Sequence, residues 1–161
     1  MKRQLLASLS FVVVCVVSGA AKEWCSIVPL HSTRADLERE IKAKPNRCNG
    51  NACIYDLPDK TIFALYAAEA TCRNDDVTTS WNVPAGTVVQ LTINFKTAQP
   101  FSALNIDVTK CDRTVDKELQ NLFYLSDYLQ GVRMEASGDT VRSITYYAAA
   151  KDDHLRCRKD K

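Results

Sequence analysis

Cysteine spacing constrains the fold of this chain more than any other sequence feature. The 161 residues contain seven cysteines, a density typical of domains in which disulfides supplement the core. Cys15 lies in an apolar N-terminal run that we interpret as a cleaved leader, so six cysteines remain after it. An even number in an exported protein predicts a set of disulfides. The six are Cys25, Cys48, Cys53, Cys72, Cys111 and Cys157.

The spacing of these cysteines favours one pairing in particular. Cys48 and Cys53 enclose an Asn-Gly turn signal, so we expect a disulfide between them. For the other four we favour Cys25 with Cys111 and Cys72 with Cys157, because each pair ties an early segment to a late one; other pairings stay open. The sequence has no Cys-x-x-Cys and only two histidines. It therefore predicts no metal site, and no cofactor motif is present.

The first 21 residues have the parts of a secretory signal peptide. Lys2 and Arg3 precede an apolar run, and small residues follow it at Ser18 to Ala21. The run is about 13 residues long, whereas a membrane-spanning helix needs about 20. We therefore predict a cleaved leader over residues 1–21, no integral membrane segment after cleavage, and an extracytoplasmic protein that is periplasmic or secreted.

Charge excludes one large class of partners. Removing Lys2 and Arg3 with the leader leaves 21 − 2 = 19 basic residues against 19 acidic ones. A formally neutral chain has no general attraction for nucleic acid, so we expect no nucleic-acid partner. Basic residues gather only in the C-terminal tail, residues 156–161. We expect a single domain over residues 22–155, with that tail after it.

Hydrophobic periodicity predicts the fold class. Thr33 and Asp36 resemble a capping box for a helix from Arg34 to about Ala43, and Pro45 prevents its continuation. Runs with β propensity or alternating burial predict strands at 52–57, 61–67, 87–95, 122–125, 132–136 and 141–147. The sequence thus predicts an α+β domain: one N-terminal helix packed on an antiparallel sheet of about five or six strands, stapled by disulfides.

Two groups of residues are candidates for function. Trp81 and Asn82 open a loop that leads into the clearest strand, and we predict that they bind a partner, although a tryptophan is often simply part of the core. His31 and His154 are the candidate acid and base of a hydrolase, with an aspartate as orienting partner. That aspartate would be Asp152, Asp153 or Asp36. No known catalytic motif surrounds either histidine, so we assign no catalytic residue.

Several motifs resemble those of a set of uncharacterised secreted bacterial proteins. They are W-x-x-I-x-P-L-H-S-T-R-A-D from Trp24, W-N-V-P from Trp81 and S-I-T-Y from Ser143. This resemblance implies a shared fold and export but no activity. A capped helix opening with Ser-Thr-Arg is more distantly similar to the SmpA/OmlA (BamE-like) lipoproteins and to β-lactamase-inhibitor-like modules. The Leu-Gly-x-Pro ending of that helix and the lipid-bearing cysteine are absent, so the similarity implies an interaction scaffold only.

The sequence therefore favours an exported, non-enzymatic domain that binds a protein or a cell-envelope component. Such a binding role does not require any of the catalytic motifs that are absent from the sequence. A small secreted hydrolase using His31 and His154 is the first alternative, and an enzyme inhibitor is the second.

Overall fold

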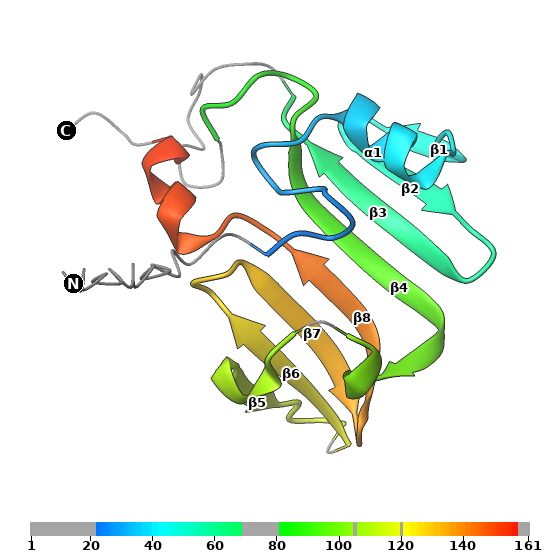
Figure 1. The fold of residues 1–161 in the computed structure, drawn as a ribbon, viewed down its shortest axis with the longest axis vertical. Helices are drawn as coiled ribbons and strands as arrows, with labels where there is room; N and C mark the ends of the chain where they lie inside the picture. Colours follow the sequence, from blue (N-terminus) through cyan, green and yellow to red (C-terminus); the bar gives the residue numbers. More distant parts are fainter. Residues whose placement is uncertain (1–21, 69–80, 105, 120, 158–161) are drawn as a thin grey trace, which may run out of the picture.

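Antiparallel strands dominate the structure (Figure 1). The computed structural model describes residues 22–68, 81–104, 106–119 and 121–157. Within these residues eight strands form one sheet, in the order β1-β2-β3-β4-β8-β7-β6-β5. The strands are β1 (Arg47–Asn49), β2 (Ala52–Asp56), β3 (Lys60–Tyr66), β4 (Val88–Pro100), β5 (Asp112–Val115), β6 (Leu122–Asp127), β7 (Val132–Ser137) and β8 (Thr140–Tyr146). Only the pairing of β4 with β8 joins segments far apart in the sequence.

The predicted α+β class with five or six strands is wrong. The described residues form an eight-stranded sheet with a single α-helix of eight residues, too small to be a layer of its own. The two missed strands, β1 and β5, are the two edges of the sheet. Every residue in both is exposed, so neither shows the alternating burial that reveals a strand in a sequence. Short, polar strands are a common way to protect a sheet edge.

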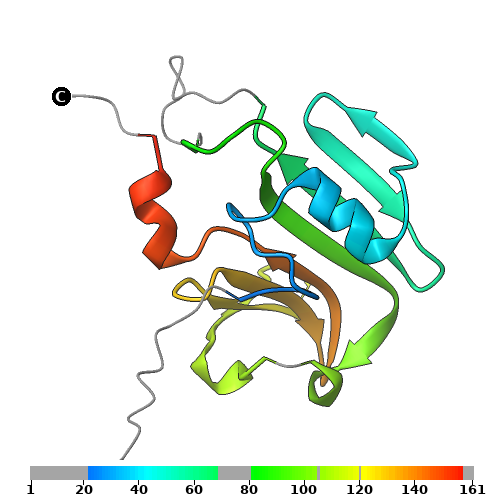
Figure 2. The ribbon, with the colours of Figure 1, turned by 45° about the horizontal axis from the view of Figure 1, so that its top comes forward.

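One face of the sheet carries the core. Buried and outward-facing side chains alternate along the inner strands, as in a sheet with one covered face. The central strands contribute Leu91, Ile93, Val132, Met134 and Ile144, each at most 2% exposed. Figure 2 shows the helix α1 and the segment before it in front of one face of the sheet. The opposite face has no comparable cover among the described residues, and we call it the open face.

The helix α1 (Arg34–Ile41) closes part of the core. Its first turn is held by a capping box: the Thr33 amide donates to the Asp36 carboxylate at 2.8 Å, and the Asp36 amide donates to the Thr33 hydroxyl at 3.3 Å. Leu37 is fully buried against the sheet, and Ile41 packs beside the same core. A helix this short depends on such packing for its stability.

Two further segments complete the cover. Residues 101–111 include the 3₁₀ turns η1 (Phe101–Ala103) and η2 (Val108–Lys110), and several of their apolar side chains pack on the main core. After β8 the chain forms η3 (Ala150–Leu155). Near it, Leu30, Val83 and Ala148 form a second, smaller apolar cluster.

The predicted Cys48–Cys53 disulfide is confirmed, and it joins the edge strand β1 to β2 where the two cysteines face each other in the ladder. Cys25 and Cys111 are free thiols here, so the structure does not contain the favoured bond between them. Cys25 is exposed, whereas Cys111 packs against the core. Cys157 is disulfide-bonded, and its expected partner, Cys72, lies outside the described residues.

Two other predicted segments lie wholly or partly outside the described residues. The leader, residues 1–21, is one, and the last four residues of the basic tail, 158–161, are the other. Among the residues that are described, no helix has the length and apolar character needed to cross a membrane.

Candidate functional site

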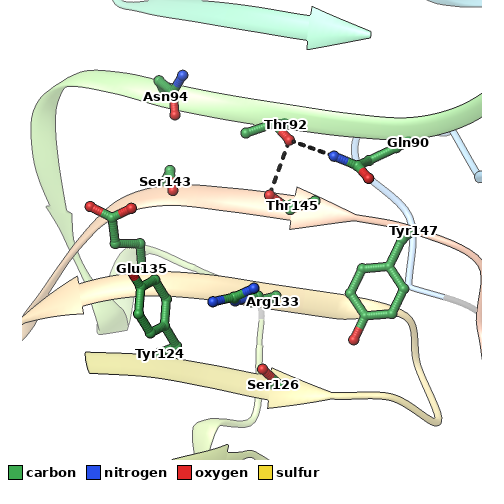
Figure 3. A pocket seen from close by; sticks show the side chains of 10 residues that line it. All are labelled: Gln90, Thr92, Asn94, Tyr124, Ser126, Arg133, Glu135, Ser143, Thr145 and Tyr147. Atoms are coloured by element: carbon green, nitrogen blue, oxygen red, sulfur yellow. Dashed lines mark hydrogen bonds between the residues drawn. The ribbon is translucent and has the colours of Figure 1, made fainter. Parts of the chain in front are cut away.

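A hollow of about 620 Å³ lies on the open face of the sheet (Figure 3). It is formed by outward-facing side chains of the four central strands β4, β8, β7 and β6, and by Tyr147 just after β8. The lining residues are Gln90, Thr92, Asn94, Tyr124, Ser126, Arg133, Glu135, Ser143, Thr145 and Tyr147. All ten are polar or carry a polar tip, so the hollow is suited to a ligand with many hydrogen-bonding groups.

The strand register arranges four of these side chains in a line across the sheet. Asn94 on β4 faces Ser143 on β8, Ser143 faces Glu135 on β7, and Glu135 faces Tyr124 on β6. We call these four residues the Asn94 row. Within the described residues, the side chains of Asn94, Ser143 and Glu135 make no hydrogen bond or ion pair with another residue. An amide, a hydroxyl and a carboxylate are thus left to meet solvent or a ligand.

A second line of four residues runs beside the first, and three of its members, Thr92, Thr145 and Arg133, contact other side chains. It comprises Thr92, Thr145, Arg133 and Ser126, again joined by the register. The Thr92 and Thr145 hydroxyls are 3.0 Å apart and hydrogen-bonded. The Arg133 guanidinium carbon lies 4.2 Å from the centre of the Tyr124 ring, a cation–π contact that fixes both side chains. This second row therefore supports the first.

Irregular pairing occurs at the end of the Asn94 row. The ladder between β4 and β8 shifts register between Asn94 and Gln99, and the ladder between β7 and β8 shifts between Glu135 and Ala136. A bulge bends its strand and increases the local twist, and bulges are frequent next to functional sites. Two shifts in neighbouring ladders bend the sheet next to the unpartnered side chains.

An apolar hollow of about 450 Å³ adjoins the polar one. Ile54, Phe63 and Leu65 point outward from β2 and β3, and Phe63 and Leu65 are exposed by 41% and 37%. Gln90 lines both hollows, so the two are neighbours on the same face. The open face therefore has a polar centre and an apolar side.

The structure brings together one of the predicted acid–base pairs. His31 Nε2 lies 3.0 Å from Asp152 Oδ1, although the two residues are 121 positions apart in the sequence. The Asp152 side chain is 3% exposed, and its second oxygen, Oδ2, has no hydrogen-bond partner. The His31 side chain is 47% exposed. The contact fastens the segment before α1 to η3 near the C-terminus.

The other predicted acid–base residues make separate local contacts. His154 Nδ1 is 2.9 Å from the carbonyl oxygen of Lys151 in its own turn. Asp153 accepts a hydrogen bond of 2.7 Å from the Tyr128 hydroxyl. Asp36 belongs to the helix cap, where hydrogen bonds from Thr33 lower its pKa to about 2. Of the two histidines, only His31 therefore has a carboxylate within hydrogen-bond distance of its ring.

Trp81 and Asn82 lie away from the hollow. Trp81 packs on the small cluster of Leu30, Val83 and Ala148, and the Arg156 guanidinium carbon sits 4.4 Å from its ring centre. The Asn82 amide donates to the Leu155 carbonyl at 2.8 Å, while its side chain is exposed. Trp81 therefore has a packing role in the fold. The binding role predicted for Trp81 and Asn82 stays a prediction.

The free thiols lack the features of a nucleophile. Burial raises the pKa of Cys25, and the neighbouring Glu40 raises it further. Burial also raises the pKa of Cys111, with Asp127 adding to the effect. A nucleophilic cysteine needs the opposite shift, because the thiolate is the reactive form. In the described part of the chain, no group of histidine, cysteine and acidic residues could hold a metal ion.

Sequence reasoning identified the outward-facing residues of two strands of this site, β4 and β7: Arg133 and Glu135 alternate with the apolar residues of β7. The alternation of β4 places Gln90, Thr92 and Asn94 on the outer face, and that pattern is visible in the sequence. The rest of the hollow depends on how β4 pairs with β8 and β8 with β7, which the alternation in each strand does not specify. Comparison with known proteins adds no further assignment: no protein-family model, curated protein or solved structure matches the chain.

Proposed function

We propose that this chain is an exported, non-enzymatic binding domain that recognises a protein or cell-envelope component through the open face of its sheet. One observation carries the proposal: the Asn94 row presents three unpartnered polar side chains in a hollow beside two register shifts. Polar groups that converge in a concave site are the usual means of orienting a ligand. The adjoining apolar side chains, Phe63 and Leu65, supply the surface whose burial favours binding.

Export is proposed from the leader-like sequence of residues 1–21. The Cys48–Cys53 disulfide is consistent with it, because such bonds persist in oxidising compartments. The resemblance to secreted bacterial proteins, and the more distant one to the SmpA/OmlA scaffold, supports the same location and an interaction role. Intact mass of the protein in the cytoplasmic and extracytoplasmic fractions tests this: we expect a mass that lacks residues 1–21 outside the cytoplasm, and full-length protein found only in the cytoplasm would contradict export.

Blocking the open face tests the binding role even while the ligand is unidentified. Ser143→Arg places a long side chain in the middle of the Asn94 row. Ala35→Arg adds the same charge on the exposed side of α1, on the covered side of the sheet. Both variants and the wild type are incubated with the cell-envelope fraction of the source organism, and the bound fraction is measured by sedimentation.

We expect wild type and Ala35→Arg to be retained equally and Ser143→Arg to lose most of its retention. Thermal unfolding of each variant checks that the fold is kept. Ser126→Arg, on β6 at the other side of the hollow, is the second blocking variant if Ser143→Arg does not fold. Equal retention of the blocked and control variants would show that the open face is not the binding surface.

The contact between His31 and Asp152 favours hydrolysis as a second candidate function. A buried carboxylate bonded to a histidine ring orients the imidazole for general acid–base work. Esterase and amidase substrates provide the assay, with His31→Ala compared to His154→Ala. Turnover that His31→Ala abolishes and His154→Ala leaves intact would establish a single-histidine hydrolase, whereas turnover unaffected by both, or no turnover in the wild type, would exclude this alternative.

A further inference from the structure

We infer that the ligand of the open face is a neutral oligosaccharide, laid across the strands along the Asn94 row. This inference rests on the proposed binding function and names the chemistry of its ligand. The structural basis is the combination of the row's unpartnered groups, the two fixed tyrosine rings beside it and the balanced charge of the lining.

Charge in the hollow points away from ionic ligands. Arg133 and Glu135 are the only residues among the ten lining side chains that carry a formal charge, and they are of opposite sign. The two side chains form no ion pair with each other in the described structure. A polyanion would meet the Glu135 carboxylate, and a polycation would meet the Arg133 guanidinium. A neutral ligand avoids both repulsions.

The unpartnered groups match hydroxyl chemistry. The Glu135 carboxylate only accepts hydrogen bonds, the Ser143 hydroxyl donates and accepts, and the Asn94 amide offers both functions on separate atoms. A ligand that satisfies all three must supply donors and acceptors within a short distance. Neighbouring hydroxyls of a sugar ring do so, because each hydroxyl can donate one bond and accept others.

The aromatic rings supply the other half of sugar recognition. Tyr124 ends the Asn94 row, and its ring is held by the Arg133 guanidinium at 4.2 Å. Tyr147 lines the hollow near Gln90, and its hydroxyl donates to the Val132 carbonyl at 3.4 Å. Ring bodies offer apolar surface to the C–H face of a sugar while polar neighbours bond its hydroxyls. Because both rings are held by the protein, less conformational entropy is lost on binding.

The row also has a suitable extent. Neighbouring strands lie about 4.8 Å apart, so four residues in register across β4, β8, β7 and β6 span about 14 Å. That distance accommodates several units of a chain molecule rather than a single small metabolite.

Glycosidases generally require two carboxyl groups flanking the scissile bond. Glu135 is the only carboxylate in the hollow, so the site is suited to binding and not to hydrolysis.

The test uses three neutral hexasaccharides as probes: cellohexaose, maltohexaose and hexa-N-acetylchitohexaose. Titration calorimetry with the full mature chain measures the dissociation constant of each. We expect at least one probe to bind with a dissociation constant below about 1 mM. Glu135→Gln and Asn94→Ala should each weaken that binding about tenfold: the first replaces a charged acceptor oxygen by an NH2 donor, and the second removes the amide altogether. Glu118→Gln is the matched control, because Glu118 is exposed in the turn before β6 and does not line the hollow.

Two results would overturn the assignment. The first is binding that Glu135→Gln and Asn94→Ala leave unchanged, which would place the sugar elsewhere. The second is the absence of binding by all three probes. If Ser143→Arg still loses its envelope retention in that case, the open face binds a different class of ligand and the proposed function stands. If Ser143→Arg also keeps its retention, the proposed function fails with the sugar assignment.

Discussion

Replacing His31 by alanine tests whether its contact with Asp152 holds the fold together. The variant leaves a carboxylate that is 3% exposed without its hydrogen-bond partner. Hydrogen bonds to charged groups contribute about 1.5–3 kcal/mol, and leaving a buried charge unpaired adds to the loss. Because the His31 side chain is 47% exposed, we take the lower part of this range. We expect His31→Ala to lower the free energy of unfolding by about 2 kcal/mol.

A double-mutant cycle with Asp152→Asn isolates the pair. Asparagine keeps the size of the side chain and removes the charge. It should therefore stabilise the His31→Ala protein, in which the carboxylate is unpaired, but not the wild type. Urea unfolding at pH 7 measures all four proteins, and we expect a coupling energy of about 1–2 kcal/mol. His154→Ala is the control, with a change below about 0.5 kcal/mol, because His154 is exposed and bonds only within its own turn. Free-energy changes that add within about 0.5 kcal/mol would refute the reasoning.

Three further predictions concern the core. Gly131→Ala should cost about 3 kcal/mol, because Gly131 has a positive φ and a Cβ there would clash with the Tyr147 carbonyl oxygen and lie 2.9 Å from the Ala149 nitrogen. Gly138 also has a positive φ but open space around it, so Gly138→Ala should cost about 1 kcal/mol. Equal losses of the two variants in thermal unfolding would contradict this. Tyr66→Phe should cost about 1 kcal/mol, since it removes the 2.7 Å hydrogen bond to the buried Tyr55 hydroxyl, and the double variant with Tyr55→Phe should cost less than the sum; additive losses would count against the bond. Burial raises the pKa of Tyr146 to about 12 in the folded protein, whereas in the unfolded chain this pKa has its ordinary value near 10. The unfolded chain therefore loses the Tyr146 proton at lower pH, and stability falls between about pH 10 and pH 12. Tyr146→Phe should remove about 3 kcal/mol of that fall, and an unchanged slope would disprove the assignment.

The fold could be predicted from the sequence where burial leaves a periodic signal. The inner strands alternate apolar and polar residues, and the helix begins at Arg34 after a Thr33/Asp36 cap, so local chemistry is enough to place them. The edge strands β1 and β5 leave no such signal, because an exposed edge has no face to bury. Missing both edges reduced the predicted sheet from eight strands to six, and treating one eight-residue helix as a layer gave the wrong class.

The candidate site could be predicted only in part, because it depends on contacts between distant segments. The sequence reveals that Arg133 and Glu135 share a face of β7, but not that Glu135 lies between Ser143 and Tyr124. The sequence also leaves three aspartates as candidate partners of His31, and only the structure shows that Asp152 is the one in contact with it. Register and long-range packing are set by the whole sheet, and single-strand patterns do not contain them.

The edges of this sheet explain why recognition should use its face. A partner that added a strand would meet β1, three residues long and joined by the Cys48–Cys53 disulfide to β2, or β5, four residues long with Asp112 and Arg113 exposed. Either edge offers only about 10–14 Å of backbone, and short or charged edges disfavour strand addition. The open face instead offers two neighbouring hollows, of about 620 and 450 Å³, lined by side chains. The proposed binding is therefore better placed on side chains of the face than on a sheet edge, and Ser143→Arg tests that placement.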